Sequence, residues 1–201
     1  MRFWTSGTSR RRPPAAADQA APLLYERIHG PQPTRRSTRD RRRRPFAYSR
    51  IIVPSLVLDR TLFLMRQRGI VGDELYLVWA GSIIDGDAFV STVVLPRTET
   101  AGLHGEVPSD VVARVFEALD ERDLLPIAQL HTHPRRADMS PTDAQRPLVV
   151  IPGFRSIIVP DFGFVVDDDT DQWKVYEYRG PDEWIENSDT LVVDDSLIRV
   201  D

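Results

Sequence analysis

The sequence predicts a single domain of the α/β (α+β) class, in which helices flank a mixed, mostly antiparallel sheet. Three observations predict it. Short apolar runs separated by turn residues begin at Ile51, two amphipathic helical patterns are inserted among them, and the Gly-rich phosphate loops of nucleotide-binding folds are missing from the sequence. The 201 residues have room for one domain of ordinary size plus additional sequence.

The charge distribution separates the additional sequence from the domain. Residues 1–50 contain thirteen arginines and three acidic residues, a net charge of +10, whereas the remaining residues contain 13 basic and 27 acidic groups, a net charge of −14. Dense like charge with little apolar surface predicts a disordered Arg/Pro-rich arm over residues 1–46 and a folded domain over residues 47–201. The arm could bind nucleic acid or another anionic partner, or be a solvated tail or start-site extension.

The composition excludes several classes of protein. The chain contains no cysteine, so disulfides, a thiolate nucleophile and cysteine-ligated metals are excluded. No apolar run approaches the roughly 18 residues that a membrane-spanning helix needs, and Asp18 and Glu26 interrupt any signal-peptide core. We therefore expect a soluble, cytoplasmic protein that does not bind membranes.

The expected elements follow from residue type and spacing. Ser55 is expected to cap a helix that ends near Arg68, and Ser109 is expected to cap a second helix. Asp85-Gly86 predicts the turn of a hairpin. The expected strands are Ile51–Val53, Glu74–Ala80, Ala88–Leu95, Pro126–Thr132, Ser156–Val159, Phe162–Val166 and Trp173–Tyr178, with Leu191–Val193 and Leu197–Val200 as further short candidates.

Two of the four histidines stand two residues apart at the end of an expected strand. Side chains at i and i+2 point to the same side of a strand, so His131 and His133 can converge on one ion. Asp143 follows in a polar loop, and two imidazoles with one carboxylate make a three-ligand zinc site with an open fourth position. On the residues alone, the alternative is a pair of surface or hydrogen-bonded histidines beside a capping aspartate.

The order of the motifs resembles a known family. His131-Thr132-His133-Pro134 followed by Ser140-x-x-Asp143 resembles the signature of the JAMM/MPN-domain (JAB) zinc metalloproteases, which place an essential glutamate on an earlier strand. Glu74-x-x-x-x-Trp79-x-Gly81 is similar to that strand in bacterial members, and residues 153–162 are similar to the strand after their metal loop. The resemblance covers about residues 48–180 and implies an MPN/JAB-type fold.

The resemblance also implies a role for each motif residue. His131, His133 and Asp143 would hold Zn²⁺, Glu74 would act on the attacking water, and Ser140 would stabilise the developing oxyanion. Several other acidic residues precede the histidines. Glu74 is chosen among them because a carboxylate on an apolar strand needs a partner.

Family members often cleave after the C-terminal tail of ubiquitin or a ubiquitin-like protein. Bacterial members occur beside activating and conjugating enzymes in defence-associated conjugation systems. The resemblance therefore implies a deubiquitinase-like zinc isopeptidase that releases a ubiquitin-like protein from its conjugates or fusions. Two alternatives stay open. One is a JAB-type domain linked to DNA processing through the basic arm. The other is a non-catalytic MPN scaffold, which is disfavoured because all five motif positions are filled.

Three further residues are candidates for substrate binding. Glu99 and His104 lie in the expected loop Pro96–Val107, which could form a wall of the groove for the substrate's tail or be an ordinary connection. Trp79 could line the same groove, although tryptophan on an apolar strand is more often a core residue.

Overall fold

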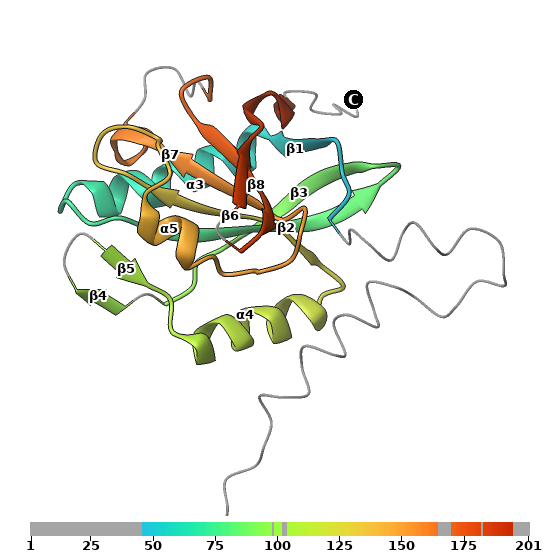
Figure 1. Cartoon of the computed structure of the whole chain (residues 1–201), viewed down its shortest axis with the longest axis horizontal. Coiled ribbons are helices and arrows are strands. Elements are labelled where there is room, and N and C mark those ends of the chain that lie inside the picture. Colours follow the sequence, from blue (N-terminus) through green and yellow to red (C-terminus); the bar gives the residue numbers. More distant parts are fainter. Residues whose placement is uncertain (1–45, 98, 102–103, 165–169, 182, 195–201) are drawn as a thin grey trace, which may run out of the picture.

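The computed structural model describes residues 46–97, 99–101, 104–164, 170–181 and 183–194 (Figure 1). The helices are α3 (Ser55–Gly69), α4 (Ser109–Asp120) and α5 (Pro141–Gln145), with 3₁₀ turns η1 (Pro160–Gly163) and η3 (Ser188–Thr190). The strands are β1 (Arg50–Pro54), β2 (Tyr76–Ile84), β3 (Asp87–Val94), β4 (Glu99–Ala101), β5 (His104–Glu106), β6 (Leu125–Thr132), β7 (Arg155–Val159), β8 (Lys174–Gly180), β9 (Glu183–Glu186) and β10 (Leu191–Asp194).

The main sheet has eight strands in the order β10-β1-β3-β2-β6-β7-β8-β9. Strand β1 runs parallel to both β10 and β3, and β6 runs parallel to β7, whereas the other four pairs are antiparallel. The expectation of a mixed, mostly antiparallel sheet with helices is thus confirmed. Strands β4 and β5 pair with each other in a separate two-stranded sheet.

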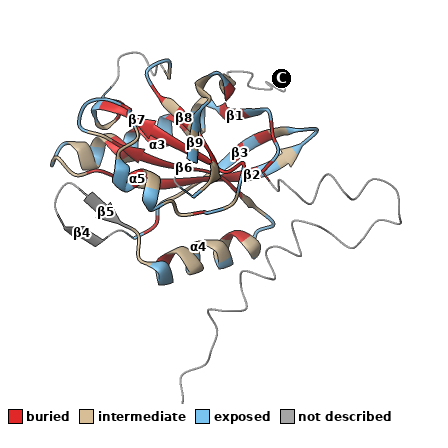
Figure 2. Cartoon of the chain, in the orientation of Figure 1, coloured by how far each residue is buried: buried red, intermediate tan, exposed pale blue. Residues whose placement is uncertain are grey.

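The core lies between the sheet and helix α3. Leu58, Leu62 and Met65 of α3 are buried, as the spacing of its apolar residues predicts. Strands β6 and β7 in the middle of the sheet are buried over nearly their whole length (Figure 2). A functional group at the end of β6 is therefore supported by pairing strands on both sides.

The β2–β3 hairpin is formed as the sequence predicts. Asp85 and Gly86 both adopt left-handed backbone conformations, with φ of 52° and 87°, between the paired residues Ile84 and Asp87. Two successive positive φ angles define a type I′ turn, whose twist matches that of antiparallel strands. Aspartate and glycine tolerate this conformation, which explains why the dipeptide identified the turn.

Three local expectations are wrong. Ser55 and Ser109 are the first helical residues rather than caps, because Pro54 and Pro108 occupy the N-cap positions and no side-chain capping bond forms there. The expected loop Pro96–Val107 contains the β4–β5 hairpin. Phe162 and Gly163 of the expected strand Phe162–Val166 lie instead in η1, where Phe162 has φ of 53°, a conformation incompatible with a strand; residues 165 and 166 lie outside the described residues.

The ends of the predicted domain fall partly outside the described residues. The core includes Phe46, which is 2% exposed and packs edge-to-face on Phe154, although the predicted arm includes this residue. The rest of the arm and the candidate strand Leu197–Val200 lie outside the described residues, whereas Leu191–Val193 forms β10. Within the described ranges, no helix is long and apolar enough to cross a membrane.

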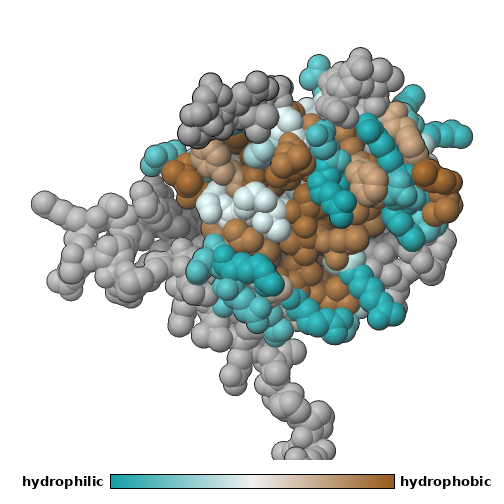
Figure 3. Space-filling model, turned by 180° about the vertical axis from the view of Figure 1, so that it is seen from behind, coloured by the Kyte–Doolittle hydropathy of each residue, from teal (hydrophilic) through white to brown (hydrophobic). Residues whose placement is uncertain are grey.

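Apolar side chains of the described residues are not confined to the core. Figure 3 shows the molecule from behind, with hydrophobic residues gathered near the middle of that face and hydrophilic residues around them. Over the described chain, the most exposed large apolar side chains are Leu56, Ile70, Val71, Val150, Ile84, Leu95, Phe63, Phe164, Ile185 and Phe89. Single exposed apolar residues are normal on protein surfaces and carry no function by themselves.

Candidate metal centre

Strand β6 delivers the first two candidate ligands. His131 lies at its end with a fully buried side chain, and His133 follows on the same side with its side chain 14% exposed. The backbone of His133 remains attached to the sheet, since its N–H donates to the carbonyl of Val159, 2.9 Å away. The alternation of side chains along the strand, continued past its end, brings the two imidazoles together as predicted.

The third candidate ligand comes from the short helix α5. Ser140 is its N-cap: the Ser140 Oγ accepts a hydrogen bond from the backbone N–H of Asp143 at 3.2 Å, and Asp143 Oδ2 accepts one from the backbone N–H of Ser140 at 2.9 Å. This reciprocal capping box, with Pro141 at the first helical position, explains the spacing of serine and aspartate in the motif. Ser140 thereby orients the carboxylate of Asp143.

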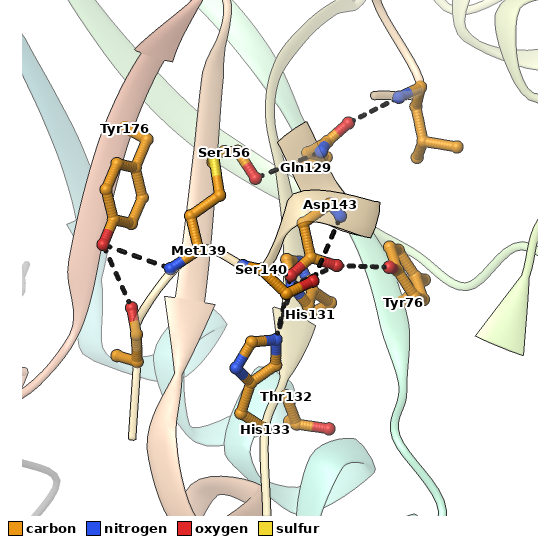
Figure 4. Close-up of polar contacts among 12 residues, drawn as sticks. Tyr76, Gln129, His131, Thr132, His133, Met139, Ser140, Asp143, Ser156 and Tyr176 are labelled. Atoms are coloured by element: carbon orange, nitrogen blue, oxygen red, sulfur yellow. Dashed lines mark hydrogen bonds and ion pairs between the residues drawn. The ribbon is translucent and has the colours of Figure 1, made fainter. Parts of the chain in front are cut away.

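The three side chains converge on one point (Figure 4). The Nε2 atoms of His131 and His133 are 3.1 Å apart. Asp143 Oδ1 lies 3.3 Å from the Nε2 of His131, and Asp143 Oδ2 lies 3.2 Å from the Nε2 of His133. Ligand atoms about 2.0–2.1 Å from a tetrahedral Zn²⁺ are about 3.3 Å from one another, so this donor set fits a metal ion of that size.

Electrostatics favour the metal-binding forms of His131 and Asp143, whereas at His133 they favour the protonated form. Burial lowers the pKa of His131, against the opposing hydrogen bond and charge of Asp143. Burial acts in the same direction on His133, but the hydrogen bond and charge of Asp143, helped by the charge of Glu74, raise the pKa of His133 above its usual value. Burial would raise the pKa of Asp143, yet hydrogen bonds from the two histidines hold it far below its usual range. Asp143 is thus ionised, as a metal ligand must be.

Glu74 lies just before β2 rather than within a strand, which corrects its expected position. Tyr76 pairs with His131 in the antiparallel register of β2 and β6, and continuing that register by two residues places Glu74 opposite His133. The side chain of Glu74 is 9% exposed, and its charge acts on both His133 and Tyr76. The glutamate therefore stands beside the ligand cluster, as the motif predicts.

Two residues beside the cluster were not among the predicted site residues. Thr132 is fully buried, accepts a hydrogen bond from the Leu75 N–H at 2.9 Å and donates its own N–H to the Leu75 carbonyl at 3.2 Å, which anchors the segment next to Glu74. Tyr76 stacks on His131 and donates a hydrogen bond to Asp143. The period of two along the strand from Glu74 to Tyr76 is the signal that could have identified the tyrosine.

The loop that carries Asp143 is held by the last strands of the sheet. The hydroxyl of Tyr176 in β8 accepts a hydrogen bond from the Met139 N–H at 3.3 Å and donates one to the Ala137 carbonyl at 3.4 Å (Figure 4). Trp184 in β9 donates its indole N–H to the Ala144 carbonyl of α5 at 3.1 Å. The sequence predicted the strand that carries Tyr176 but assigned no role to residues 184–201, of which Trp184 supports the metal loop.

The three candidate substrate-binding residues have different outcomes. Trp79 is fully buried, donates its indole N–H to Thr61 Oγ1 at 2.8 Å and packs near Trp173. It is therefore a core residue under α3 and not a groove residue, which corrects the prediction. Glu99 is the first residue of β4 and His104 is the first residue of β5. The structure describes only the backbone of these two residues.

Sequence comparison connects this geometry to known proteins. The chain is 30% identical over 102 residues to a protein of Sinorhizobium fredii described as the probable metalloprotease y4jG. The match covers 49% of this chain and 63% of the relative's length. No protein-family model matches the chain. The similarity to a probable metalloprotease, the ordered motif and the converging ligands all indicate a metalloprotease.

The metalloprotease relative, together with the converging ligands, supports an assignment to the MPN/JAB metalloprotease family. Among solved structures, the chain resembles the protein DSY2949 of Desulfitobacterium hafniense with a TM-score of 0.56 and 14% identity, over 74% of this chain and 95% of the other. AF2198, a JAB1/MPN domain protein from Archaeoglobus fulgidus, superposes more loosely, with a TM-score of 0.41 and 18% identity over 72% of this chain and 99% of the other. The likeness to DSY2949 supports the fold.

Proposed function

We propose that this chain is an MPN/JAB-type zinc-dependent peptidase or isopeptidase that cleaves after the C-terminal tail of a ubiquitin-like protein. The observation that carries the proposal is the convergence of His131, His133 and Asp143 beside Glu74. Two imidazole nitrogens and one carboxylate are a donor set that suits Zn²⁺, and three protein ligands leave a position for substrate or water, as in catalytic zinc sites. When bound, Zn²⁺ supplies Lewis acidity, which polarises a carbonyl and makes water nucleophilic near neutral pH.

Glu74 is the proposed general base and acid. Its carboxylate is mostly buried beside His133, where it can accept a proton from the attacking water and later deliver it to the leaving amine. A carboxylate with this double role accounts for peptide hydrolysis in a chain that has no cysteine nucleophile. Proton transfer by a positioned side chain contributes about 10²–10⁴-fold to such rates.

Ser140 is the proposed donor to the developing oxyanion. Its Oγ accepts the Asp143 N–H, so the capping bond occupies a lone pair and leaves the hydroxyl hydrogen available to a substrate oxygen. The same side chain can therefore orient Asp143 and stabilise negative charge. Both roles require a hydroxyl, because an alanine at this position would remove the cap and the donor together.

The β4–β5 hairpin is the proposed docking element for the tail of the ubiquitin-like protein. It directly precedes the first turn of α4 (Figure 1), and its two strands pair only with each other among the described elements. Each strand therefore has an outer edge whose backbone groups could pair with an extended peptide. Release of a conjugated protein in the bacterial cytoplasm, next to activating and conjugating enzymes of an antiviral system, is the cellular role that we propose.

Glu74→Gln tests the catalytic part of this proposal. A ubiquitin-like domain fused through its C-terminal tail to a reporter is the substrate, and bound zinc is measured by mass spectrometry. We expect the Glu74→Gln protein to retain zinc while its cleavage rate falls about 10²–10⁴-fold, because the ligands stay and the proton carrier is lost. Glu121→Gln, an acidic residue with a well exposed side chain beyond α4, is the matched control and should change neither.

Two results would contradict the proposal. Undiminished cleavage by the Glu74→Gln protein would remove Glu74 from its role. A zinc-loaded parent chain that cleaves no ubiquitin-like fusion or isopeptide conjugate would favour the non-catalytic scaffold.

DNA processing is the second candidate function, and the net charge of +10 in residues 1–50 favours it. Phosphate contacts make DNA binding fall steeply with salt concentration. If this candidate is correct, the full chain binds duplex DNA at low salt, and replacing Arg41–Arg44 by glutamine abolishes that binding together with activity. Retention of fusion cleavage by the glutamine variant would favour the ubiquitin-like substrate.

A further inference from the structure

The two histidines of the cluster are supported in different ways. The Nδ1 of His133 contacts the carbonyl oxygen of Arg136 at 3.1 Å, an outer hydrogen bond that fixes the tautomer and directs Nε2 toward the cluster. The Nδ1 of His131 is buried, and no described residue offers it a hydrogen-bond partner. Something other than a hydrogen bond at Nδ1 must hold the His131 ring in place.

The residue that contacts the His131 ring is Tyr76. Its ring lies against the ring of His131, with centroids 4.9 Å apart and planes inclined by 10°, which is an offset-stacked arrangement. The contact follows from the sheet, because Tyr76 and His131 are directly paired across β2 and β6. Side chains of a directly paired couple stand next to each other on the same face.

Tyr76 also reaches the ligand that comes from the loop. Its hydroxyl donates a hydrogen bond to Asp143 Oδ1 at 3.4 Å, the same oxygen that faces the Nε2 of His131 (Figure 4). One side chain on β2 thus contacts a ligand on β6 and a ligand on α5. The two contacted ligands are twelve residues apart in sequence and belong to elements that do not pair with each other.

We infer that Tyr76 is a positioning residue that holds His131 and Asp143 in ligand geometry before the ion arrives, and thereby sets the metal affinity of the site. The inference rests on the proposed metal site. A free imidazole and a free carboxylate lose rotational freedom when they bind an ion, and contacts that hold them in advance reduce that loss. Removal of such supporting contacts typically weakens metal binding 10–100-fold.

The test compares Tyr76→Phe with Tyr48→Phe. The first change keeps the stacked ring and removes the hydroxyl that contacts Asp143. The second removes another buried hydroxyl, which donates to the Ile127 carbonyl at 2.6 Å and contacts no residue of the cluster. Metal-free protein is titrated with Zn²⁺ against a chromogenic chelator and with Co²⁺ followed by its visible absorption, and thermal unfolding of the metal-free protein is measured in parallel.

We expect Tyr76→Phe to weaken Zn²⁺ binding about tenfold and to change the Co²⁺ absorption bands, because Asp143 is less well held. Tyr76→Leu, which also removes the stacked ring, should weaken binding further, toward 100-fold. Tyr48→Phe should lower the melting temperature and leave both metal readouts within twofold of the parent chain.

Three outcomes would overturn the inference. They are a Tyr76→Phe protein that binds Zn²⁺ within twofold of the parent, an equal loss of affinity in Tyr48→Phe, and a parent chain that binds neither ion. The last outcome also overturns the zinc site of the proposed function. If Tyr76→Phe weakens metal binding while the parent chain cleaves no ubiquitin-like fusion, the inference stands and the proposed reaction fails.

Discussion

The metal centre is made of two halves that the chain holds by different means. The strand half is His131, fully buried at the end of β6, with the paired strands β2 and β7 on either side. The loop half is Asp143 on the five-residue helix α5, which pairs with no strand and depends on its capping box and on bonds from β8 and β9. The sheet places one ligand, whereas a few individual side chains place the other.

This difference separates stability from metal binding. A residue in the strand half supports both the packed core and the ion, because its burial is shared with many neighbours. A residue in the loop half supports the ion through one or two hydrogen bonds, each worth about 1 kcal/mol to folding. Changes in the two halves should therefore have similar effects on metal binding and different effects on the free energy of unfolding.

Removal of one ligand from each half is the strongest way to break this comparison. We expect His131→Ala and Asp143→Ala both to abolish zinc binding. The free energy of unfolding of the metal-free protein should fall by about 2–3 kcal/mol for His131→Ala, which leaves a cavity beside Tyr76, and by about 1 kcal/mol for Asp143→Ala, which loses the hydrogen bond from the Ser140 N–H to the carboxylate. Urea unfolding monitored by circular dichroism gives both values, and a larger loss for Asp143→Ala would reverse the assignment of the two halves.

A pH series sharpens the comparison at His133, which is the more exposed histidine. The pKa of His133 is raised above its usual value of about 6.5, so the metal-free site binds a proton there that an incoming ion must displace. Zinc affinity should be constant at high pH and fall about tenfold per pH unit once the pH drops below that raised pKa.

Calorimetric titrations with Zn²⁺ at a series of pH values would measure this fall. Glu74→Gln removes one of the charges that raise the pKa of His133, so the fall should begin at a lower pH in that variant. A zinc affinity that is unchanged from pH 8 to pH 6 would contradict the expectation.

Trp184→Phe is the mildest test of the loop half. It removes the indole hydrogen bond to Ala144 and keeps an aromatic ring to pack on Tyr178. We expect zinc affinity to fall a few-fold and the free energy of unfolding to fall by about 1 kcal/mol. Ile185→Val, a neighbouring substitution at a side chain that is 45% exposed, is the control and should change neither quantity.

Local patterns predicted those parts of the site that depend on neighbouring residues. The i, i+2 spacing placed His131 and His133 on one side of β6, and the spacing from Ser140 to Asp143 corresponds to a capping box that closes within four residues. Asp85-Gly86 identified the hairpin turn for the same reason, since its two positive φ angles are a property of two adjacent residues.

Other parts could not be predicted because they depend on distant pairing. Glu74 was expected on a strand, but its position follows from the β2–β6 register, which pairs Tyr76 with the distant His131. The contact of Tyr76 with His131 follows from the same register. Trp79 was considered for the groove because a single sequence does not show which face of a strand is covered by another element. In the structure, helix α3 covers the face of β2 that carries Trp79.

The sequence by itself determined the kinds of ligand, their spacing on β6 and α5, and the family that their order resembles. Only the tertiary structure decided that α5 faces the end of β6, that Glu74 stands opposite His133, and that β8 and β9 hold the metal loop. The physical reason is the range of the forces involved. Backbone dihedral preferences and capping bonds act within a few residues, whereas the site is assembled by strand pairing and burial, which join segments that no local pattern connects.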